Sequence, residues 1–283
     1  GIPAGGFNVV EGSNSRGMGE VLTQHPDVAK FTFTGSTGVG KLLLTQCATT
    51  VKKVSMELGG NAPFIVFNDA AVQGAIVSKY RNAGQTCVCT NRILVQQGVL
   101  EEFTEKFIKA VNELSLGNGL ATGVDLGPMI SDKAVSDVER LVEDSVDAGA
   151  TVAFGGQRTE AGECFYQPTI LTGVTNDMPI AANEIFGPVS PIIAFDTEQE
   201  AIDLANDTEY GLAAYFYSRD IGTVWRVAEG LEFGMVGINE GIISNAAAPF
   251  GGVKQSGNGR EGSKYGLDDY LEIKYLCMGG LNK

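Results

Sequence analysis

The chain carries at positions 81–92 the stretch Arg81-Asn82-Ala83-Gly84-Gln85-Thr86-Cys87-Val88-Cys89-Thr90-Asn91-Arg92, a turn-forming segment that leads into the apolar run 93–95. Only the thiolate of a cysteine is a good nucleophile, and cationic neighbours and exposed backbone N–H groups lower the pKa of a thiol. With an arginine at each end of the stretch, we interpret Cys87 as a candidate nucleophile. The alternative is that Cys87 and Cys89 alternate on a half-buried strand as small apolar residues.

A second stretch, Val54-Ser55-Met56-Glu57-Leu58-Gly59-Gly60-Asn61, lies thirty residues before the cysteine. Glu57 ends an apolar run directly before a pair of glycines. A carboxylate at the point where a strand enters a glycine turn can project into a cleft, where partial desolvation raises its pKa. That setting suits a general base. The alternative is a solvated glutamate at the edge of a sheet.

Alternating strand and helix patterns follow one another along the whole chain. Apolar residues recur at helical spacing in 99–114 and 132–148, so we expect core-facing helices there. The order of elements predicts an α/β fold with a mostly parallel sheet. We expect strands at 31–34, 51–58, 62–67, 91–96, 151–154, 168–174, 213–217 and 235–239, and helices at 70–82, 99–114, 132–148, 198–205 and 220–229.

The segment 31–44 reads as a strand, a glycine-containing loop at 35–40 and a helix that opens at Lys41. Such an arrangement can bind phosphate, because the N–H groups at a helix N-terminus face the anion. The spacing of Gly35, Gly40 and Lys41 nearly matches a P-loop, which would make the protein a nucleotide-binding protein of another class. A P-loop needs Ser or Thr where this chain has Leu42, so we give that alternative less weight.

The bulk composition limits the partners that we expect. The net charge of −14 argues against nucleic acid and anionic membrane surfaces, which both require a positive field. No apolar run approaches the roughly 20 residues of a membrane span. The five cysteines have irregular spacing, so a reducing cytoplasm is the expected compartment. The single histidine, His25, lies outside every motif, and Cys87 and Cys89 alone are too few ligands for structural zinc, so we expect no metal site.

Taken together, these stretches resemble the aldehyde dehydrogenase superfamily, and the resemblance covers nearly the whole chain. Five family motifs occur in the family's order, namely Phe33-Thr34-Gly35-Ser36-Thr37, Glu57-Leu58-Gly59-Gly60, Gly84-Gln85-Thr86-Cys87, Glu184-Ile185-Phe186-Gly187-Pro188-Val189 and Pro249-Phe250-Gly251-Gly252-Val253-Lys254-Gln255-Ser256-Gly257. Within the family, the Gly-Gln-Thr-Cys-Val-Cys form with Arg81, the segment 241–244 and the tail 260–266 look most like succinate-semialdehyde dehydrogenases.

The resemblance implies how the chain is divided. Residues 1–58 would be the C-terminal part of a Rossmann-like dinucleotide-binding domain, 59–262 an α/β catalytic domain, and 263–283 an oligomerisation segment whose strand at 270–278 joins a dimer or tetramer. The opening residues 1–10 read as a turn that feeds a strand, so we expect the chain to be a fragment of a longer enzyme. The interval from Glu57 to Cys87 is about one helical turn shorter than in the family, with the shortfall near 69–72.

The resemblance also implies roles for the two candidate groups. Cys87 would attack the aldehyde, and Glu57 would activate the water that hydrolyses the resulting thioester. Cys89 is a possible redox partner of Cys87 through a reversible disulfide, and a small packed residue is the alternative. Arg81 and Ser244 would bind the distal carboxylate of succinate semialdehyde. The other alternative is a catalytically silent fragment of a dehydrogenase.

For the cofactor, NAD or NADP, the resemblance implies five contacts. Gly35 and Ser36 would contact the pyrophosphate, and Leu58 would also line the cofactor site. Glu184 would bind the hydroxyls of the nicotinamide ribose, and Phe186 would pack beside that ribose. Without the resemblance, Glu184 and Phe186 would be read as a surface acid and a core aromatic.

Overall fold

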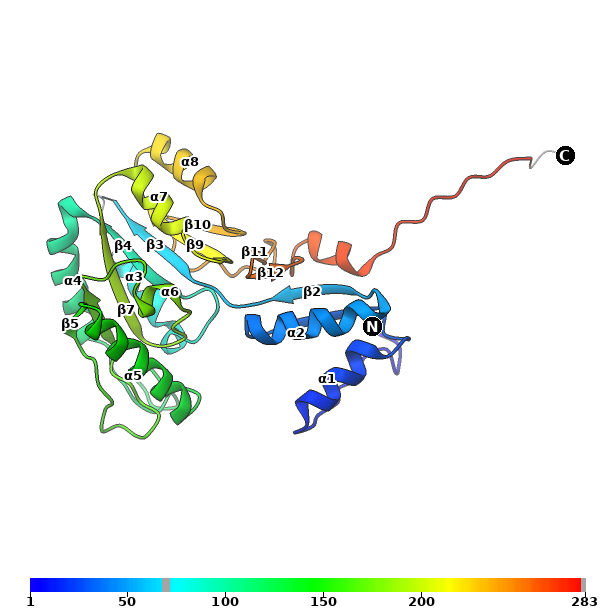
Figure 1. Ribbon diagram of the computed structural model, residues 1–283, viewed down its shortest axis with the longest axis horizontal. Helices are drawn as coiled ribbons and strands as arrows, with labels where there is room; N and C mark the ends of the chain where they lie inside the picture. The colour runs from blue at the N-terminus through cyan, green and yellow to red at the C-terminus, as the bar shows by residue number, and fades with distance from the viewer. Residues whose placement is uncertain (68–71, 281–283) are drawn as a thin grey trace.

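The computed structural model describes residues 1–67 and 72–280, and its largest part is a seven-stranded sheet (Figure 1). All neighbouring strands of this sheet are parallel except the edge strand β5. The strand order is β10 (Met235–Ile238), β9 (Ala213–Tyr217), β3 (Ala62–Val66), β4 (Thr90–Gln96), β7 (Val189–Phe195), β6 (Thr169–Thr172) and β5 (Thr151–Phe154). The mostly parallel α/β fold predicted from the sequence is confirmed.

Helices cover both faces of the large sheet. Successive residues of a strand point to opposite faces, and here both faces carry buried apolar side chains. Phe64 packs in a core with α3 (Val72–Tyr80) and α4 (Leu100–Asn112). Ile65 packs on the other face with α5 (Asp132–Asp147), α6 (Pro179–Ala182), α7 (Glu198–Asn206) and α8 (Ile221–Gly230). The helical stripes expected in 99–114 and 132–148 are confirmed, since Phe103, Phe107 and Val135 are fully buried.

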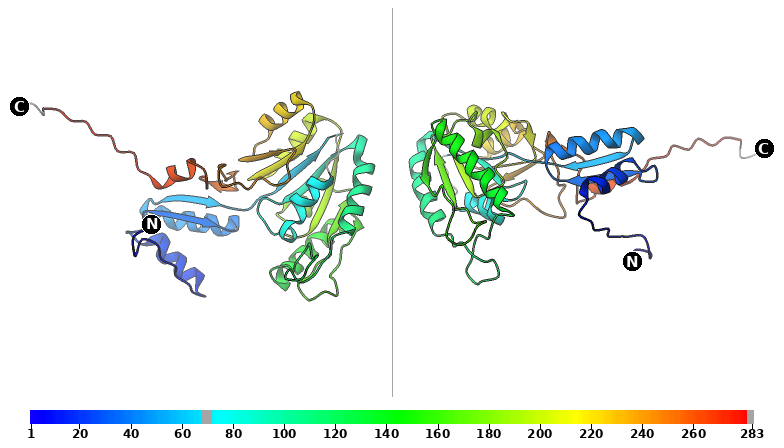
Figure 2. Two further views of the ribbon diagram at one scale, coloured as in Figure 1. Left: turned by 180° about the vertical axis from the view of Figure 1, so that it is seen from behind. Right: turned by 60° about the horizontal axis from the view of Figure 1, so that its bottom comes forward.

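A smaller group of elements stands beside the large sheet and is joined to it through β2 (Lys53–Glu57) and β3 (Figures 1 and 2). It contains α1 (Ser15–Gln24), α2 (Thr37–Cys47) and a three-stranded sheet in which β2 lies between β1 (Lys30–Thr34) and β12 (Gly257–Asn258). Two short strands, β8 (Tyr210–Gly211) and β11 (Val253–Lys254), pair separately, and four 3₁₀ segments complete the description: η1 (Ala48–Thr50), η2 (Arg81–Gly84), η3 (Gln97–Val99) and η4 (Tyr265–Tyr270).

Helix α2 begins earlier than the sequence suggested, at Thr37 and not at Lys41. The glycine of this helix that faces inward is Gly40, where an added Cβ would lie 2.4 Å from Leu58 Cδ2. Gly40 therefore allows close packing of the helix against the end of β2. Because residues 37–40 are helical, the segment does not form the glycine loop that a P-loop requires, and that alternative is not supported.

Strand β7 was not identified from the sequence, although it lies inside the sheet between β4 and β6. It contains Pro191, and proline is normally confined to sheet edges because it lacks an N–H donor. Here Pro191 aligns with Leu171 of β6, whereas pairing with β4 starts one residue later at Ile192. The proline is thus tolerated where the strand has a neighbour on one side only. Helix α1 was also not identified.

Both ends of the chain differ from the expected pattern. Within the described residues, neither 7–10 nor 270–278 forms a strand. Ile273 is fully exposed, and among the described residues the tail pairs with no strand. The predicted shortfall near 69–72 lies almost wholly outside the described residues. The division at residues 58 and 262 stays a prediction, and β12, from the second of those parts, pairs with β2 at the end of the first.

Candidate active site

Three strands that are neighbours in the large sheet begin beside the same cavity. Gly60 lies just before β3, Cys87 just before β4, and Glu184 before β7, and these three strands are adjacent and parallel. Parallel strands start at the same edge of a sheet, so the three segments meet there. From the small sheet, the carboxyl ends of β1 and β2 bring Thr34 and Glu57 to the same place.

The cavity between these ends has a volume of about 300 Å³. Seven of the residues predicted from the sequence line it, together with Thr34 and Gly59. These seven are Gly35, Ser36, Glu57, Leu58, Cys87, Glu184 and Phe186. Segments that are far apart in the sequence are therefore brought together as the family resemblance implied, and their roles stay predictions.

Glu57 is 2% exposed, and burial raises the pKa of its carboxyl group to about 8. The negative charge of Glu261 raises this pKa further, and the positive charge of Arg260 lowers it. Among the described residues, neither carboxylate oxygen of Glu57 has a hydrogen-bond partner. The environment predicted from the sequence, a desolvated carboxylate at the end of a strand, is thus present.

The environment of Cys87 is opposite in sign to the one predicted. Burial raises the pKa of its thiol to about 11, and the negative charges of Glu184 and Glu57 raise it further. Its own backbone N–H acts in the other direction. Arg92 does not face the thiol, because its guanidinium donates instead to Asn61, Asn176 and the carbonyl oxygens of 204 and 205. The prediction that cationic neighbours lower the pKa of Cys87 is therefore wrong, since no arginine contributes to its shift and burial raises it.

The turn that carries Cys87 approaches the Glu184 segment very closely. Asn82, Ala83 and Gly84 all have positive φ, and an added Cβ on Gly84 would lie 2.2 Å from the carbonyl oxygen of Gly187. Glycine is required where two backbones come this close. The cysteine turn and the Glu184 segment are therefore in close backbone contact.

Glu184 faces the cavity, and its Oε1 accepts a hydrogen bond of 2.9 Å from the backbone N–H of Gly60. Burial raises the pKa of Glu184, and this hydrogen bond acts against the rise. Phe186 is 44% exposed and has a φ of 49°, an uncommon conformation for an aromatic residue. Its apolar ring lines the cavity and is partly open to solvent.

Ser36 precedes α2 as its N-cap residue, and its side chain makes no capping hydrogen bond. The first N–H groups of a helix have no partner within the helix. Gly35 and Ser36 therefore border a positive helix end that opens on the cavity, an arrangement that suits a phosphate.

Arg81, Ser244 and Cys89 do not line the cavity. Arg81 is half-buried, and its guanidinium forms no ion pair with a carboxylate of the described residues, whereas Ser244 is exposed in the loop after β10. Cys89 is buried, accepts a hydrogen bond from Thr86 Oγ1 at 2.7 Å, and is a free thiol.

Two further residues that shape the site were not singled out from the sequence. Ser256 is fully buried, accepts from the N–H of Gly211 and donates to the carbonyl oxygen of Gly59 at 2.6 Å. Gln85 accepts from the N–H of Ile130 at 2.8 Å, and so holds the segment before α5 against the cysteine turn. Both residues lie inside the quoted family motifs, and this position was the only feature of the sequence that could have identified them.

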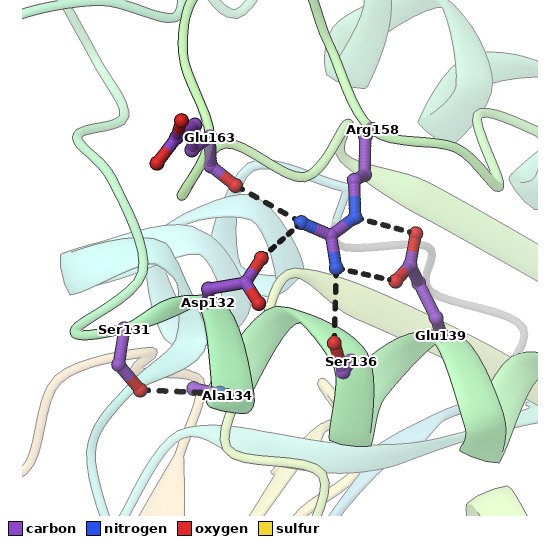
Figure 3. Close-up of polar contacts among 7 residues, drawn as sticks. All are labelled: Ser131, Asp132, Ala134, Ser136, Glu139, Arg158 and Glu163. Carbon is purple, nitrogen blue, oxygen red and sulfur yellow. Dashed lines mark hydrogen bonds and ion pairs between the residues drawn. The ribbon is translucent and has the colours of Figure 1, made fainter.

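Further contacts fix helix α5, which begins directly after the segment that Gln85 holds (Figure 3). Ser131 caps α5 by accepting from the N–H of Ala134. Arg158 binds Glu139 with two donors and also contacts Asp132 near the start of the helix. These contacts pin α5 to the loop after β5, and they raise the pKa of Arg158.

In the part of the chain that the structure describes, no group of three or more His, Cys, Asp or Glu side chains could hold a metal ion. No helix of residues 1–67 and 72–280 is long and apolar enough to cross a bilayer.

Comparison with known proteins agrees with this architecture. The profile of the aldehyde dehydrogenase family matches residues 1–276. A 3-sulfolactaldehyde dehydrogenase of Pseudomonas putida is 61% identical over 287 aligned residues, which cover 100% of this chain and 59% of that protein. A mitochondrial succinate-semialdehyde dehydrogenase of Oryza sativa subsp. japonica is 56% identical over 286, covering 100% of this chain and 54% of that protein.

A solved structure shows the same fold. The crystal structure of an NADP-dependent enzyme of E. coli superposes with a TM-score of 0.96 at 56% identity, over 99% of this chain and 59% of that one. The chain thus spans between 54% and 59% of the length of these relatives. Since the family profile matches almost every residue, the chain belongs to the aldehyde dehydrogenase family.

Proposed function

We propose that this chain carries the nucleophile, the general base and part of the cofactor site of an NAD(P)-dependent aldehyde dehydrogenase. The observation that supports this most strongly is the cavity in which Cys87, Glu57 and Glu184 meet. A thiol, a buried carboxyl without a partner and a second carboxyl beside a helix N-terminus form the minimum set for thioester chemistry with a dinucleotide. Membership of the family supports the same reaction.

In the proposed reaction, the Cys87 thiolate attacks the aldehyde carbon and forms a thiohemiacetal. Loss of a hydride from that carbon leaves a thioester on Cys87. The ionised carboxylate of Glu57 then takes a proton from the water that attacks the thioester, which releases the acid and restores the thiol. The backbone N–H of Cys87 would donate to the oxygen that becomes negative during both attacks.

The residues of the cavity fit a nicotinamide dinucleotide. The uncapped start of α2 at Ser36 suits a pyrophosphate, Glu184 can accept from ribose hydroxyls, and Phe186 and Leu58 offer apolar surface. A bound dinucleotide would supply the acceptor for the hydride, and the positive charge of its oxidised form would favour the thiolate. Such a charge would offset the carboxylates that raise the pKa of Cys87.

The proposed substrate is an aldehyde with an anionic group at its far end, with succinate semialdehyde as the first candidate. Arg81 carries no carboxylate partner among the described residues and is free to bind such an anion with two donors, and Ser244 would add a hydroxyl. The name of the 61% identical relative favours 3-sulfolactaldehyde as the second candidate, whose sulfonate is also anionic.

Two expectations about the whole protein also stay proposals. We propose a homo-oligomer, a dimer or tetramer, and a cytoplasmic location. The apolar and exposed tail supports the first, since Ile273 is fully exposed. The irregularly spaced cysteines, which are free among the described residues, agree with a reducing compartment.

The test is an NAD(P)H absorbance assay with both aldehydes on the full-length protein and its variants. Cys87→Ala is expected to remove turnover by several orders of magnitude, as does loss of the nucleophile in other covalent enzymes. Cys164→Ala, at a half-buried cysteine outside the cavity, is the matched control and is expected to keep the rate. Turnover is expected to rise with pH towards about 8, because Glu57 must be ionised to act as a base.

Retained activity in Cys87→Ala would refute the proposed mechanism. A folded protein with no activity towards either aldehyde, with either dinucleotide, would support a catalytically silent fragment instead.

A further inference from the structure

We propose that Asn91 is a positioning residue that sets the place of Glu184 in the cavity, an inference that rests on the proposed role of Glu184 in dinucleotide binding. Asn91 is 4% exposed and lies in β4, a few residues after Cys87 in the sequence. It does not line the cavity itself. Its side chain instead holds the backbone on both sides of Glu184.

The side-chain amide of Asn91 pairs with two peptide groups. Its Nδ2 donates to the carbonyl oxygen of Asn183 at 2.8 Å, and its Oδ1 accepts from the N–H of Ile185 at 2.9 Å. This two-bond pairing imitates a strand that would lie beside residues 183–185. Glu184 lies between the two anchored peptide groups, so its Cα has little freedom to move.

A buried network fixes the orientation of the Asn91 amide. Asn91 Nδ2 also donates to Asn61 Oδ1 at 3.1 Å, and that same oxygen accepts from Arg92 Nε at 2.8 Å. Because the Arg92 guanidinium can only donate, this atom of Asn61 must be the oxygen. Asn61 Nδ2 then donates to the carbonyl oxygen of Ala181 at 2.7 Å, which anchors the end of α6 directly before residues 183–185.

The network connects three family motifs through side chains that are not reactive. Asn61 follows the glycine pair after Glu57 and holds α6, while Asn91 follows Cys87 and holds the loop that contains Glu184. Glu184 Oε1 in turn accepts from the N–H of Gly60, which lies next to Asn61. A carboxylate that must accept from two ribose hydroxyls tolerates little displacement, because a hydrogen bond weakens steeply when its distance or angle departs from the optimum.

The experiment compares Asn91→Ala with Asn176→Ala in the full-length protein. Asn176 is the matched control, because its Oδ1 accepts from the same Arg92 at 2.8 Å while its amide contacts residues 204 and 207 and not the Glu184 loop. Asn91→Ala is expected to raise the KM for the dinucleotide at least about tenfold with a smaller change in kcat. Asn176→Ala is expected to lower the melting temperature and leave this KM within about twofold.

A second readout does not depend on the reaction. Hydrogen exchange of the Ile185 amide is expected to become faster in Asn91→Ala and to stay unchanged in Asn176→Ala, because only the former removes its acceptor. If Asn91→Ala does not fold, Asn91→Ser takes its place, since its shorter side chain also loses the acceptor for Ile185 and the donor for Asn183.

An unchanged dinucleotide KM in a variant whose Ile185 amide exchanges faster would overturn the proposal, as would equal effects of the two alanine variants. If the unsubstituted protein binds no dinucleotide, the proposed function fails. The exchange rate of the Ile185 amide then decides alone whether Asn91 positions Glu184.

Discussion

At the scale of single residues, burial controls the two groups that would perform the chemistry. It raises the pKa of Glu57 to about 8 and that of Cys87 to about 11, and in both cases a nearby carboxylate adds to the rise. A neutral thiol and a neutral carboxyl are both unreactive in their proposed roles. At neutral pH the burial of both side chains therefore favours their protonated forms, and a positive charge beside Cys87 would favour its thiolate.

The raised pKa of Glu57 makes a prediction about stability. The unfolded chain loses this proton near pH 4.5, whereas the folded protein keeps it up to about pH 8, so the free energy of unfolding falls as pH rises through this window. Each unit of pKa difference corresponds to about 1.4 kcal/mol as an upper limit. Glu57→Gln does not titrate, so it is expected to match the unsubstituted protein near pH 5 and to melt at a higher temperature near pH 9.

Thermal unfolding of both proteins across this pH range checks the prediction. Glu229→Gln is the control, because Glu229 is an exposed glutamate on α8 and its loss should not create this pH dependence. A constant difference in melting temperature between Glu57→Gln and the unsubstituted protein at all pH values would contradict the assignment.

At the scale of elements, the site depends on how closely the ends of strands approach one another. The chain at Gly60 approaches the nucleophile very closely. An added Cβ on Gly60 would lie 2.3 Å from the backbone oxygen of Cys87. A backbone atom cannot move aside as the end of a flexible side chain can. The cysteine turn before β4 is therefore seated directly on the chain that enters β3.

Gly60→Ala is expected to destabilise the protein by about 1–3 kcal/mol, as overpacking in a core does, and to displace Cys87. Gly38→Ala is the matched control: Gly38 lies in α2, and an added Cβ there would meet nothing within 4 Å. That substitution should be neutral or stabilise the protein by up to about 1 kcal/mol, because alanine is the better helix former. Chemical unfolding and the alkylation rate of Cys87 measure both effects, and equal stability of the two variants would count against the close approach.

At the scale of the whole molecule, the tail at 270–278 exposes apolar side chains that no other part of the described chain covers. Lys53 holds its start, through an ion pair of 2.9 Å with Glu272 and a hydrogen bond to the carbonyl oxygen of Leu271. Beyond that point Ile273 is fully exposed and Tyr275 is 84% exposed. Burial of such side chains against another subunit would stabilise an oligomer by about 1.5–3 kcal/mol each.

Ile273→Lys is therefore expected to weaken the proposed oligomer and leave the fold of each subunit intact. Sedimentation velocity at several protein concentrations measures the change in assembly. Lys274→Gln serves as the control, because neighbouring residues of an extended segment point to opposite sides. The proposed role of the tail would be lost if Ile273→Lys and the unsubstituted protein sedimented alike as the same oligomer.

The sequence by itself determined the class of fold, most of the elements and seven of the residues that line the cavity. Helical stripes and strand runs are local patterns, so α4, α5, β3 and β4 could be found from neighbouring residues alone. Family motifs identified Cys87, Glu57 and Glu184. Strand β7 was missed because Pro191 is a poor strand residue unless its neighbours in the sheet are known.

Only the tertiary structure decided the electrostatics and the supports of the site. Arg92 stands near Cys87 in the sequence but is directed into a buried amide network, while Glu184, far away in the sequence, lies close enough to raise the thiol pKa. The clamp of Asn91 on residues 183–185 likewise joins positions more than ninety apart. Burial and charge act through space, and the register of β3, β4 and β7 determines which segments become neighbours.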